Sequence, residues 1–238
     1  MPVYQLDKEL VFPHPSLAEE DGLLAVGGDL STERLLLAYA NGIFPWYDEG
    51  WPIMWWAPDP RMVLFPEKLK ISKSLKQTLR NKKFTVTFDA HFKDVIEACS
   101  KVPRSGQNGT WIVREMKQAY IRLHEKGYAH SVEIFKDGLL AGGLYGVSLG
   151  RIFFGESMFH IERDASKVAL FYLVERLKKW EFMLIDAQQD TPHMRKLGGE
   201  TIPGRRFLEI LKQSLQYPTI IGNWDNTETL DNNHIKTG

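Results

Sequence analysis

The sequence has a single cysteine among its 238 residues, so no disulfide can form within the chain. This is typical of a protein that works in a reducing compartment. Cys99 follows Phe92, Val95 and Ile96 at helical spacing, which favours a buried packing position over a nucleophile. The chain also lacks a signal peptide and an apolar run of membrane length. We therefore expect a cytoplasmic protein that has no membrane partner.

Motifs for several common chemistries are missing as well. The seven histidines are scattered, and together with one cysteine they form no metal-ligand pattern. The sequence contains no P-loop, no dinucleotide-binding fingerprint and no Gly-x-Ser-x-Gly elbow. The sequence does not exclude a Ser–His–Asp triad assembled from distant positions. We expect neither a metal nor a bound cofactor.

The chain has no net charge, because 30 Lys and Arg residues balance 30 Asp and Glu residues. Any nucleic-acid surface must therefore be local. Residues 68–83 contain no acidic residue and seven basic ones: Lys68, Lys70, Lys73, Lys76, Arg80, Lys82 and Lys83. Helical spacing predicts one shared face for four of these: Lys73, Lys76, Arg80 and Lys83. A solvated helix face and a phosphate-binding surface both explain this basic run, and its single sign favours the second.

Two parts of the chain differ in composition. Residues 1–62 are rich in proline and hold four of the seven tryptophans: Trp46, Trp51, Trp55 and Trp56. One helix is predicted there, starting after Ser31 and ending at Asn41-Gly42. We predict a small N-terminal α+β domain over residues 1–62, followed by a second domain over residues 63–238. Its polar end, from Gly222 onward, is expected to be a loose tail.

The second domain alternates helices and strands. Helices are predicted over 91–99, 114–126, 165–179 and 205–215, and strands over 84–88, 130–135, 139–147, 151–154 and 182–187. Asp137-Gly138 predicts a hairpin, so the central sheet should be mostly antiparallel. This α+β order resembles the GNAT-type N-acyltransferase fold, a resemblance of topology that leaves function open.

A candidate site follows the last two predicted strands. Residues 155–164 are predicted to form a loop that carries Glu156 and Met158. Asp186 and Gln188 end the strand over 182–187, and residues two apart on a strand point the same way. The pair could hold and orient a reacting amine, or it could only cap the end of the strand. An acyl-CoA donor would need a glycine-rich loop before the helix at 165–179, and residues 156–167 contain no glycine.

Tryptophans in turns suggest a second kind of site. Trp46 lies in a Gly-Ile-Phe-Pro-Trp turn and Trp111 in a Gly-Thr-Trp turn. Both positions favour exposed rings on which a nucleotide base can stack, although packing in the core explains them too. For Trp55 and Trp56 we favour packing in the core or between domains.

Ten motifs, in order along the chain, resemble the leucyl/phenylalanyl-tRNA–protein transferase family. They are GGDLS (27–31), GIFPW (42–46), WWAPDPR (55–61), GTWI (109–112), HSVE (130–133), GGLYG (142–146), GESMF (155–159), ASK (165–167), IDAQ (185–188) and HMRKLGGETIP (193–203). The resemblance implies a GNAT-like enzyme that works without CoA. It would transfer Leu or Phe, and Met as a further candidate, from aminoacyl-tRNA to proteins that begin with Arg or Lys. In bacteria this transfer marks proteins for N-end-rule degradation.

The resemblance also implies roles for individual residues. Trp46 and Trp111 would flank the 3′-terminal adenosine of the tRNA, and Glu156 would be a carboxylate of the acceptor site. Asp186 and Gln188 would be the catalytic pair. The apolar amino-acid pocket would be formed by Leu144, Phe153, Met158, Leu170, Leu173 and Ile185. The basic run from Lys68 to Lys83 would contact the tRNA backbone.

A neutral amide is a very poor base, so we expect Gln188 to orient the acceptor amine and Asp186 to support it electrostatically. The proton would then leave through water or a ribose hydroxyl. Leu144 and Leu173 stand where the family also has methionine and phenylalanine, which leaves the choice among Leu, Phe and Met open. We expect a monomer. Two alternatives remain: a CoA-dependent N-acyltransferase, and a non-catalytic module that binds RNA or protein N-termini and does not need Asp186 and Gln188.

Overall fold

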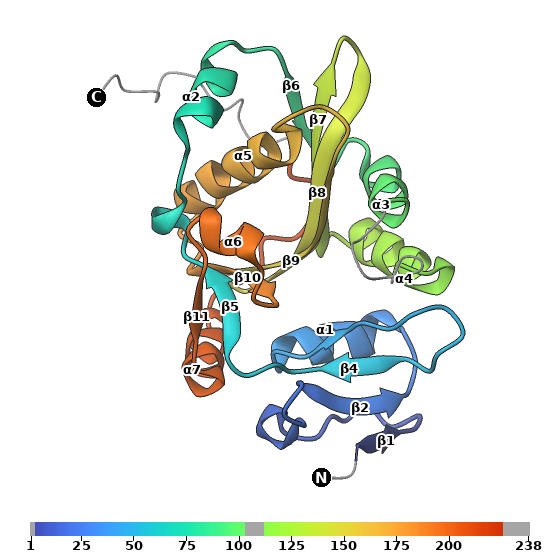
Figure 1. The fold of residues 1–238 in the computed structure, drawn as a ribbon. Coiled ribbons are helices and arrows are strands. Elements are labelled where there is room, and N and C mark those ends of the chain that lie inside the picture. The colour runs from blue at the N-terminus through green and yellow to red at the C-terminus, as the bar shows by residue number, and fades with distance from the viewer. Residues whose placement is uncertain (1–2, 103–111, 226–238) are drawn as a thin grey trace.

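The computed structural model describes residues 3–102 and 112–225. Within these ranges the chain forms two β-sheets, seven α-helices and two short 3-10 helices, η1 (Pro15–Leu17) and η2 (Pro66–Lys68). The predicted α+β class is confirmed. Figure 1 shows the larger sheet with helices on both faces and the N-terminal part of the chain below it.

The N-terminal part is built on a four-stranded sheet. Its spatial order is β1 (Tyr4–Leu6), β2 (Leu23–Gly27), β4 (Met54–Trp56) and β3 (Phe44–Pro45). The helix α1 (Thr32–Ala40) connects β2 to β3 along the chain. It begins where predicted, because the Ser31 hydroxyl accepts a hydrogen bond from the Arg34 backbone N–H. It ends before Gly42, whose φ of 72° only glycine adopts readily.

The central sheet has seven strands. They are, in spatial order, β11 (Glu200–Ile202), β5 (Arg61–Leu64), β10 (Leu184–Gln188), β9 (Ile152–His160), β8 (Leu139–Leu149), β7 (Ala129–Lys136) and β6 (Thr85–Phe88). Every neighbouring pair is antiparallel except β9 and β10, which are parallel. The predicted mostly antiparallel sheet is therefore confirmed.

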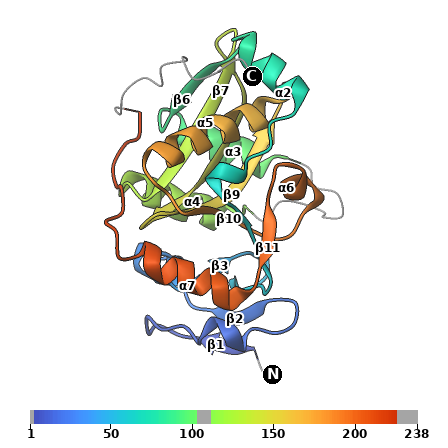
Figure 2. The same cartoon turned by 90° about the vertical axis from the view of Figure 1, so that its left-hand side faces the viewer.

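Helices cover both faces of the central sheet (Figure 1). On one face lie α2 (Lys73–Arg80) and α5 (Ala165–Lys179), and on the other lie α3 (Phe92–Ser100) and α4 (Arg114–Glu125). The short α6 (Pro192–Lys196) follows β10, and α7 (Gly204–Ser214) runs beside the N-terminal sheet in Figure 2. Cys99 is buried in the core, as predicted. Within the described residues, none of the helices has the length and apolar character that a bilayer span requires.

Three predicted local structures are wrong. Residues 155–160 belong to β9 instead of a loop, because they pair with β8 as far as Gly142 and His160. Lys83 lies outside α2, which ends at Arg80. The chain after Gly222 is not loose as far as it is described, because the Trp224 side chain is 1% exposed and packs in the core. The predicted domain boundary at residues 62 and 63 stays a prediction.

Candidate active site

The site forms where β9 and β10 separate. The two strands pair only as far as Phe154 and Asp186, and β9 then continues along β8. A cavity of about 140 Å³ lies at this point. Its walls come from β3, β9, β10 and the segment after β10: Phe44, Pro45, Trp46, Gly155, Glu156, Ala187, Gln188, Gln189, Thr191 and Met194. Glu156 is the one acidic side chain among these described lining residues.

Asp186 lies beside this cavity in a buried ion pair. Arg61 on β5 donates from Nε to Oδ1 at 2.8 Å and from its terminal nitrogen to Oδ2 at 2.7 Å. Both residues are at most 1% exposed. The guanidinium also lies over the rings of Phe44 and Phe207, at 4.8 and 4.7 Å from their centroids. The negative charge of Asp186 is therefore compensated inside the protein.

Gln188 does not continue the regular strand. Its φ is 64°, and the register of β10 against β5 shifts between Asp186 and Gln188. The prediction that both side chains point the same way from a regular strand is wrong for this reason. The Gln188 backbone N–H donates to Asp186 Oδ1 at 2.9 Å, while its side-chain Nε2 donates to Glu156 Oε1 at 2.9 Å. Asp186 thus holds Gln188 through the backbone and leaves the amide side chain at the cavity.

Glu156 is held by neutral partners. The Tyr39 hydroxyl lies within hydrogen-bond distance of Oε1, at 2.7 Å, and the Tyr120 hydroxyl lies within hydrogen-bond distance of Oε2, at 2.8 Å. The two hydroxyl oxygens are 2.6 Å apart. Burial raises the pKa of Glu156 to about 7, and the nearby negative charge of Asp186 acts in the same direction, against hydrogen bonds from the tyrosines and Gln188. Burial also raises the pKa of both tyrosines, which therefore stay neutral.

The sequence analysis missed Arg61, Tyr39 and Tyr120 as site residues. Arg61 lies 125 positions from Asp186, and Tyr39 lies 117 positions from Glu156. Arg61 closes the motif WWAPDPR, which was the available signal. Tyr39 and Tyr120 each lie in the buried apolar stripe of a helix, and such a position predicts a packing role in the core. The phenolic groups of these helices reach Glu156 only because α1 and α4 meet beside β9.

The six residues predicted to form the apolar pocket lie in one cluster between the sheet and α5. Leu144, Phe153, Leu170, Leu173 and Ile185 are at most 3% exposed, and Met158 packs against them half-buried. None of these six described residues lines the cavity at Glu156. Phe153 and Ile185 pair with each other across β9 and β10, so the cluster begins directly behind the point where the strands separate.

Trp46 lines two cavities. One is the cavity at Glu156, and the other is an aromatic cavity of about 260 Å³. The aromatic cavity is lined by Trp46, Tyr47, Asp48, Trp51, Met54 and Trp56. Trp46 is half-buried and its ring centroid lies 5.5 Å from that of Trp56, which donates from Nε1 to the Trp46 carbonyl at 2.6 Å. Trp55 is fully buried, as predicted, whereas Trp111 lies outside the described residues.

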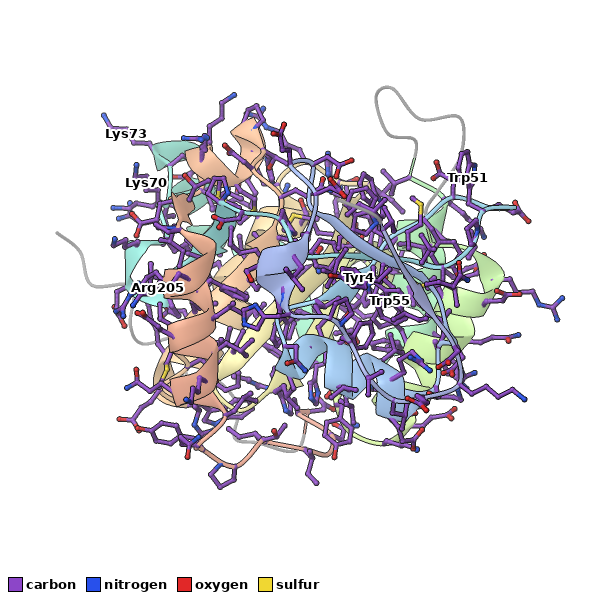
Figure 3. The ribbon with its side chains drawn as sticks, turned by 90° about the horizontal axis from the view of Figure 1, so that it is seen from below. Tyr4, Trp51, Trp55, Lys70, Lys73 and Arg205 are labelled. Carbon is purple, nitrogen blue, oxygen red and sulfur yellow. The ribbon has the colours of Figure 1, made fainter. Side chains whose placement is uncertain are left out.

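The basic run lies on the outside of the molecule. All seven of its basic side chains are exposed. On α2 the Ser72 hydroxyl caps the helix, and Leu75 and Leu79 are buried, so Lys73, Lys76 and Arg80 take the solvent side. Figure 3 shows Lys70 and Lys73 reaching outward at one edge of the molecule, opposite Trp51. Lys68 is paired with Glu200 at 2.6 Å. Among residues 3–102 and 112–225, no group of three or more His, Cys, Asp or Glu side chains could hold a metal ion.

Comparison with known proteins identifies relatives of this chain. A protein from Desulfatibacillum aliphaticivorans called leucyl/phenylalanyl-tRNA–protein transferase is 59% identical over 224 residues, which cover 94% of this chain and 96% of that protein. A protein of the same name from Syntrophus aciditrophicus is 56% identical over 97% of both chains. A solved GCN5-related N-acetyltransferase from Kribbella flavida is 11% identical over 69% of this chain and 58% of its own, with a TM-score of 0.36. At that TM-score the likeness carries no weight.

Family models give the same assignment over most of the chain. The model for the leucyl/phenylalanyl-tRNA protein transferase matches residues 63–212, and the model for its N-terminal domain matches residues 28–59. The first match alone covers more than half of the chain and includes Glu156, Asp186 and Gln188. The chain therefore belongs to the leucyl/phenylalanyl-tRNA protein transferase family, whose members are aminoacyl-tRNA-dependent enzymes.

Proposed function

We propose that this protein transfers Leu or Phe, with Met as a further candidate, from aminoacyl-tRNA to the α-amino group of proteins that begin with Arg or Lys, marking them for N-end-rule degradation. One observation carries the proposal. The cavity at the end of β10 combines a carboxylate, Glu156, with an amide, Gln188, whose backbone is fixed by the Arg61–Asp186 pair. The carboxylate would pair with the cationic side chain of the acceptor residue, and the neighbouring amide would hold its α-amine.

The chemistry is aminolysis of an ester. The acceptor nitrogen attacks the carbonyl carbon, the bond to the ribose oxygen breaks, a peptide bond forms, and the ribose oxygen leaves with a proton. A free α-amine has a reference pKa of about 7.7–8.0, so a usable neutral fraction exists near pH 7. Holding amine and ester together supplies roughly 7–11 kcal/mol at best. In this reaction Gln188 orients the amine, and Asp186 keeps the Gln188 backbone in place.

The donor fits the aromatic side of the site. A nucleotide base that stacks on Trp46 in the aromatic cavity would share this indole with the cavity at Glu156, because Trp46 lines both. The apolar cluster behind Phe153 and Ile185 supplies the surface that would receive the aminoacyl side chain. The exposed basic run supplies cations for the tRNA phosphates.

A transfer assay tests the function. The protein is incubated with labelled Leu-tRNA and a peptide that begins with Arg, and Leu-Arg-peptide is sought by mass spectrometry. The same peptide beginning with Glu serves as the control and should remain unmodified. The Gln188→Ala variant should lower kcat about 10- to 1,000-fold with a smaller effect on KM, because its contact matters most in the attacking geometry. Transfer to neither peptide would refute the proposed function.

A second assay tests the tRNA surface. Reversing Lys73, Lys76 and Arg80 on α2 to Glu should weaken aminoacyl-tRNA binding and flatten its dependence on salt, because fewer counterions are released. Turnover of a minimal aminoacyl-adenosine donor should hardly change. A control with the same change of net charge reverses the exposed Lys8, Lys93 and Lys101. Equal tRNA affinity in both variants would remove α2 from the binding surface.

A further inference from the structure

The oxygen atoms around Glu156 form a closed ring of short contacts. Glu156 Oε1 is 2.7 Å from the Tyr39 hydroxyl, that hydroxyl is 2.6 Å from the Tyr120 hydroxyl, and the Tyr120 hydroxyl is 2.8 Å from Glu156 Oε2. Each of these separations is a hydrogen-bond distance between two oxygens. A contact of that length between two oxygens requires a proton, since two facing lone pairs repel each other.

If Glu156 is ionised, the ring has three oxygen–oxygen contacts but only two protons to fill them. The two tyrosine hydroxyls provide two protons, and three contacts need three. If Glu156 is ionised, both hydroxyls donate to it, and the 2.6 Å contact between the tyrosines is left without a proton. A carboxyl proton on Glu156 completes the ring. The amide of Gln188 cannot replace it, because Nε2 donates to Oε1 from outside the ring.

The surroundings of Glu156 also favour a neutral acid. The groups that face it are Tyr39 from α1, Tyr120 from α4, and Asp186 and Gln188 from β10, with Tyr145 of β8 beyond the two tyrosines. The cation beside Asp186 is Arg61, and its Nε and one terminal nitrogen donate to Asp186. Burial raises the pKa of Glu156 to about 7, which agrees with the proton count.

We propose that Glu156 is a neutral carboxylic acid in the free protein, its proton shared in the ring with Tyr39 and Tyr120, and that the cationic side chain of an acceptor displaces this proton to solvent through the cavity. The second half rests on the proposed function. The balance is simple: the O–H bond of the carboxyl group breaks, an ion pair with the guanidinium or ammonium group forms, and one proton reaches the buffer. The two tyrosines are positioning residues, because their hydroxyl groups help to determine whether Glu156 is neutral or ionised.

Infrared spectroscopy of the free protein tests the first half. A carboxylic-acid C=O band is expected at pH 6, should disappear in Glu156→Gln, and should titrate away as pH rises through about 7. Glu133→Gln is the matched control. Glu133 is also buried, and each of its carboxylate oxygens accepts one hydrogen bond, from the hydroxyl of Ser131 or of Thr87. Two hydroxyl protons are therefore enough for its two contacts. The band should persist in this control. A wild-type spectrum without the band at pH 6 overturns the proposal.

Conservative variants test the ring itself. Tyr39→Phe and Tyr120→Phe each remove one partner of the carboxyl group, so each should shift the frequency of the band. Because phenylalanine keeps the packing of the aromatic ring, a shift in frequency would report the loss of the hydroxyl group. An unchanged frequency in both variants would show that the carboxyl group is not a member of the ring.

Calorimetry tests the proton displacement. Without a tRNA donor, a peptide that begins with Arg is titrated into the protein in buffers of different ionisation enthalpy. Binding should release about one proton at pH 6, about half at pH 7 and almost none at pH 8.5. Glu156→Gln should release none, nor should a peptide that begins with Ala. An infrared band without proton release overturns the displacement step. A band and release without any transfer in the enzymatic assay would instead refute the proposed function.

Discussion

Asp186 and Glu156 are buried carboxyl groups on neighbouring strands, yet their surroundings differ. Asp186 on β10 receives two hydrogen bonds from the Arg61 guanidinium. The hydrogen-bonding partners of Glu156 on β9 are all neutral among the described residues: two tyrosine hydroxyls and an amide. The nature of the partner, more than depth of burial, therefore distinguishes the two groups. Asp186 acts as a fixed part of the framework, whereas Glu156 is able to change its charge.

The largest effect is expected when the partner of Asp186 is removed. Arg61→Met leaves a buried carboxylate without its cation and should lower the free energy of unfolding by about 3–5 kcal/mol. Urea denaturation followed by fluorescence measures this. The double variant Arg61→Met/Asp186→Leu should recover much of the loss, because neither charge remains. A single variant that loses less than about 1 kcal/mol would mean that Asp186 does not depend on Arg61 for its compensation.

A somewhat smaller effect is expected when the charge of Glu156 is removed. The pKa of Glu156 is raised from 4.5 to about 7, so between these pH values the folded state binds more protons than the unfolded state. Wild-type stability should therefore be lost as pH rises through this window, by about 3 kcal/mol in total. Glu156→Gln removes this titration. Its unfolding free energy relative to wild type should rise between pH 4.5 and 7 and stay level above about pH 8; a difference that does not vary with pH would contradict the raised pKa.

The smallest effect is expected from the rings that hold Arg61. Phe207→Leu removes one aromatic face 4.7 Å from the guanidinium and should cost about 1–2 kcal/mol of unfolding free energy. In the Arg61→Met background the same change should cost less, since the cation–π part is already lost. A double-mutant cycle measures the difference, with about 0.5–1 kcal/mol expected. Identical costs in both backgrounds would show that the rings only fill space.

The sequence was most informative where the pattern is local. The helix α5 runs over Ala165–Lys179, as predicted, because its apolar stripe and its boundaries are all within fifteen residues. The hairpin at Asp137-Gly138 was predicted for the same reason. The extension of β9 through Gly155 and Glu156 was missed, since those residues have weak strand propensity and are ordered by pairing with β8.

The site could be predicted only in part. Asp186, Gln188 and Glu156 were proposed from short motifs, but their mutual geometry depends on contacts across more than thirty positions. The bulge that turns Gln188 towards Glu156 depends on the pairing of β10 with both β5 and β9, which no local pattern encodes. The ring with Tyr39 and Tyr120 could not be predicted, because two helices and a strand that are distant along the chain assemble it.

The last described segment of the chain sets a limit on how far the protein can be shortened. The Trp224 ring stacks on His130 with centroids 3.7 Å apart and lies 6.0 Å from Phe153 of the predicted amino-acid pocket. Its backbone N–H donates to Asp89 at 2.8 Å. A chain cut after Gly222 would lose this indole and leave an unfilled space behind Phe153. Residues 223–225 are therefore part of the architecture around the pocket, and an affinity tag belongs after them.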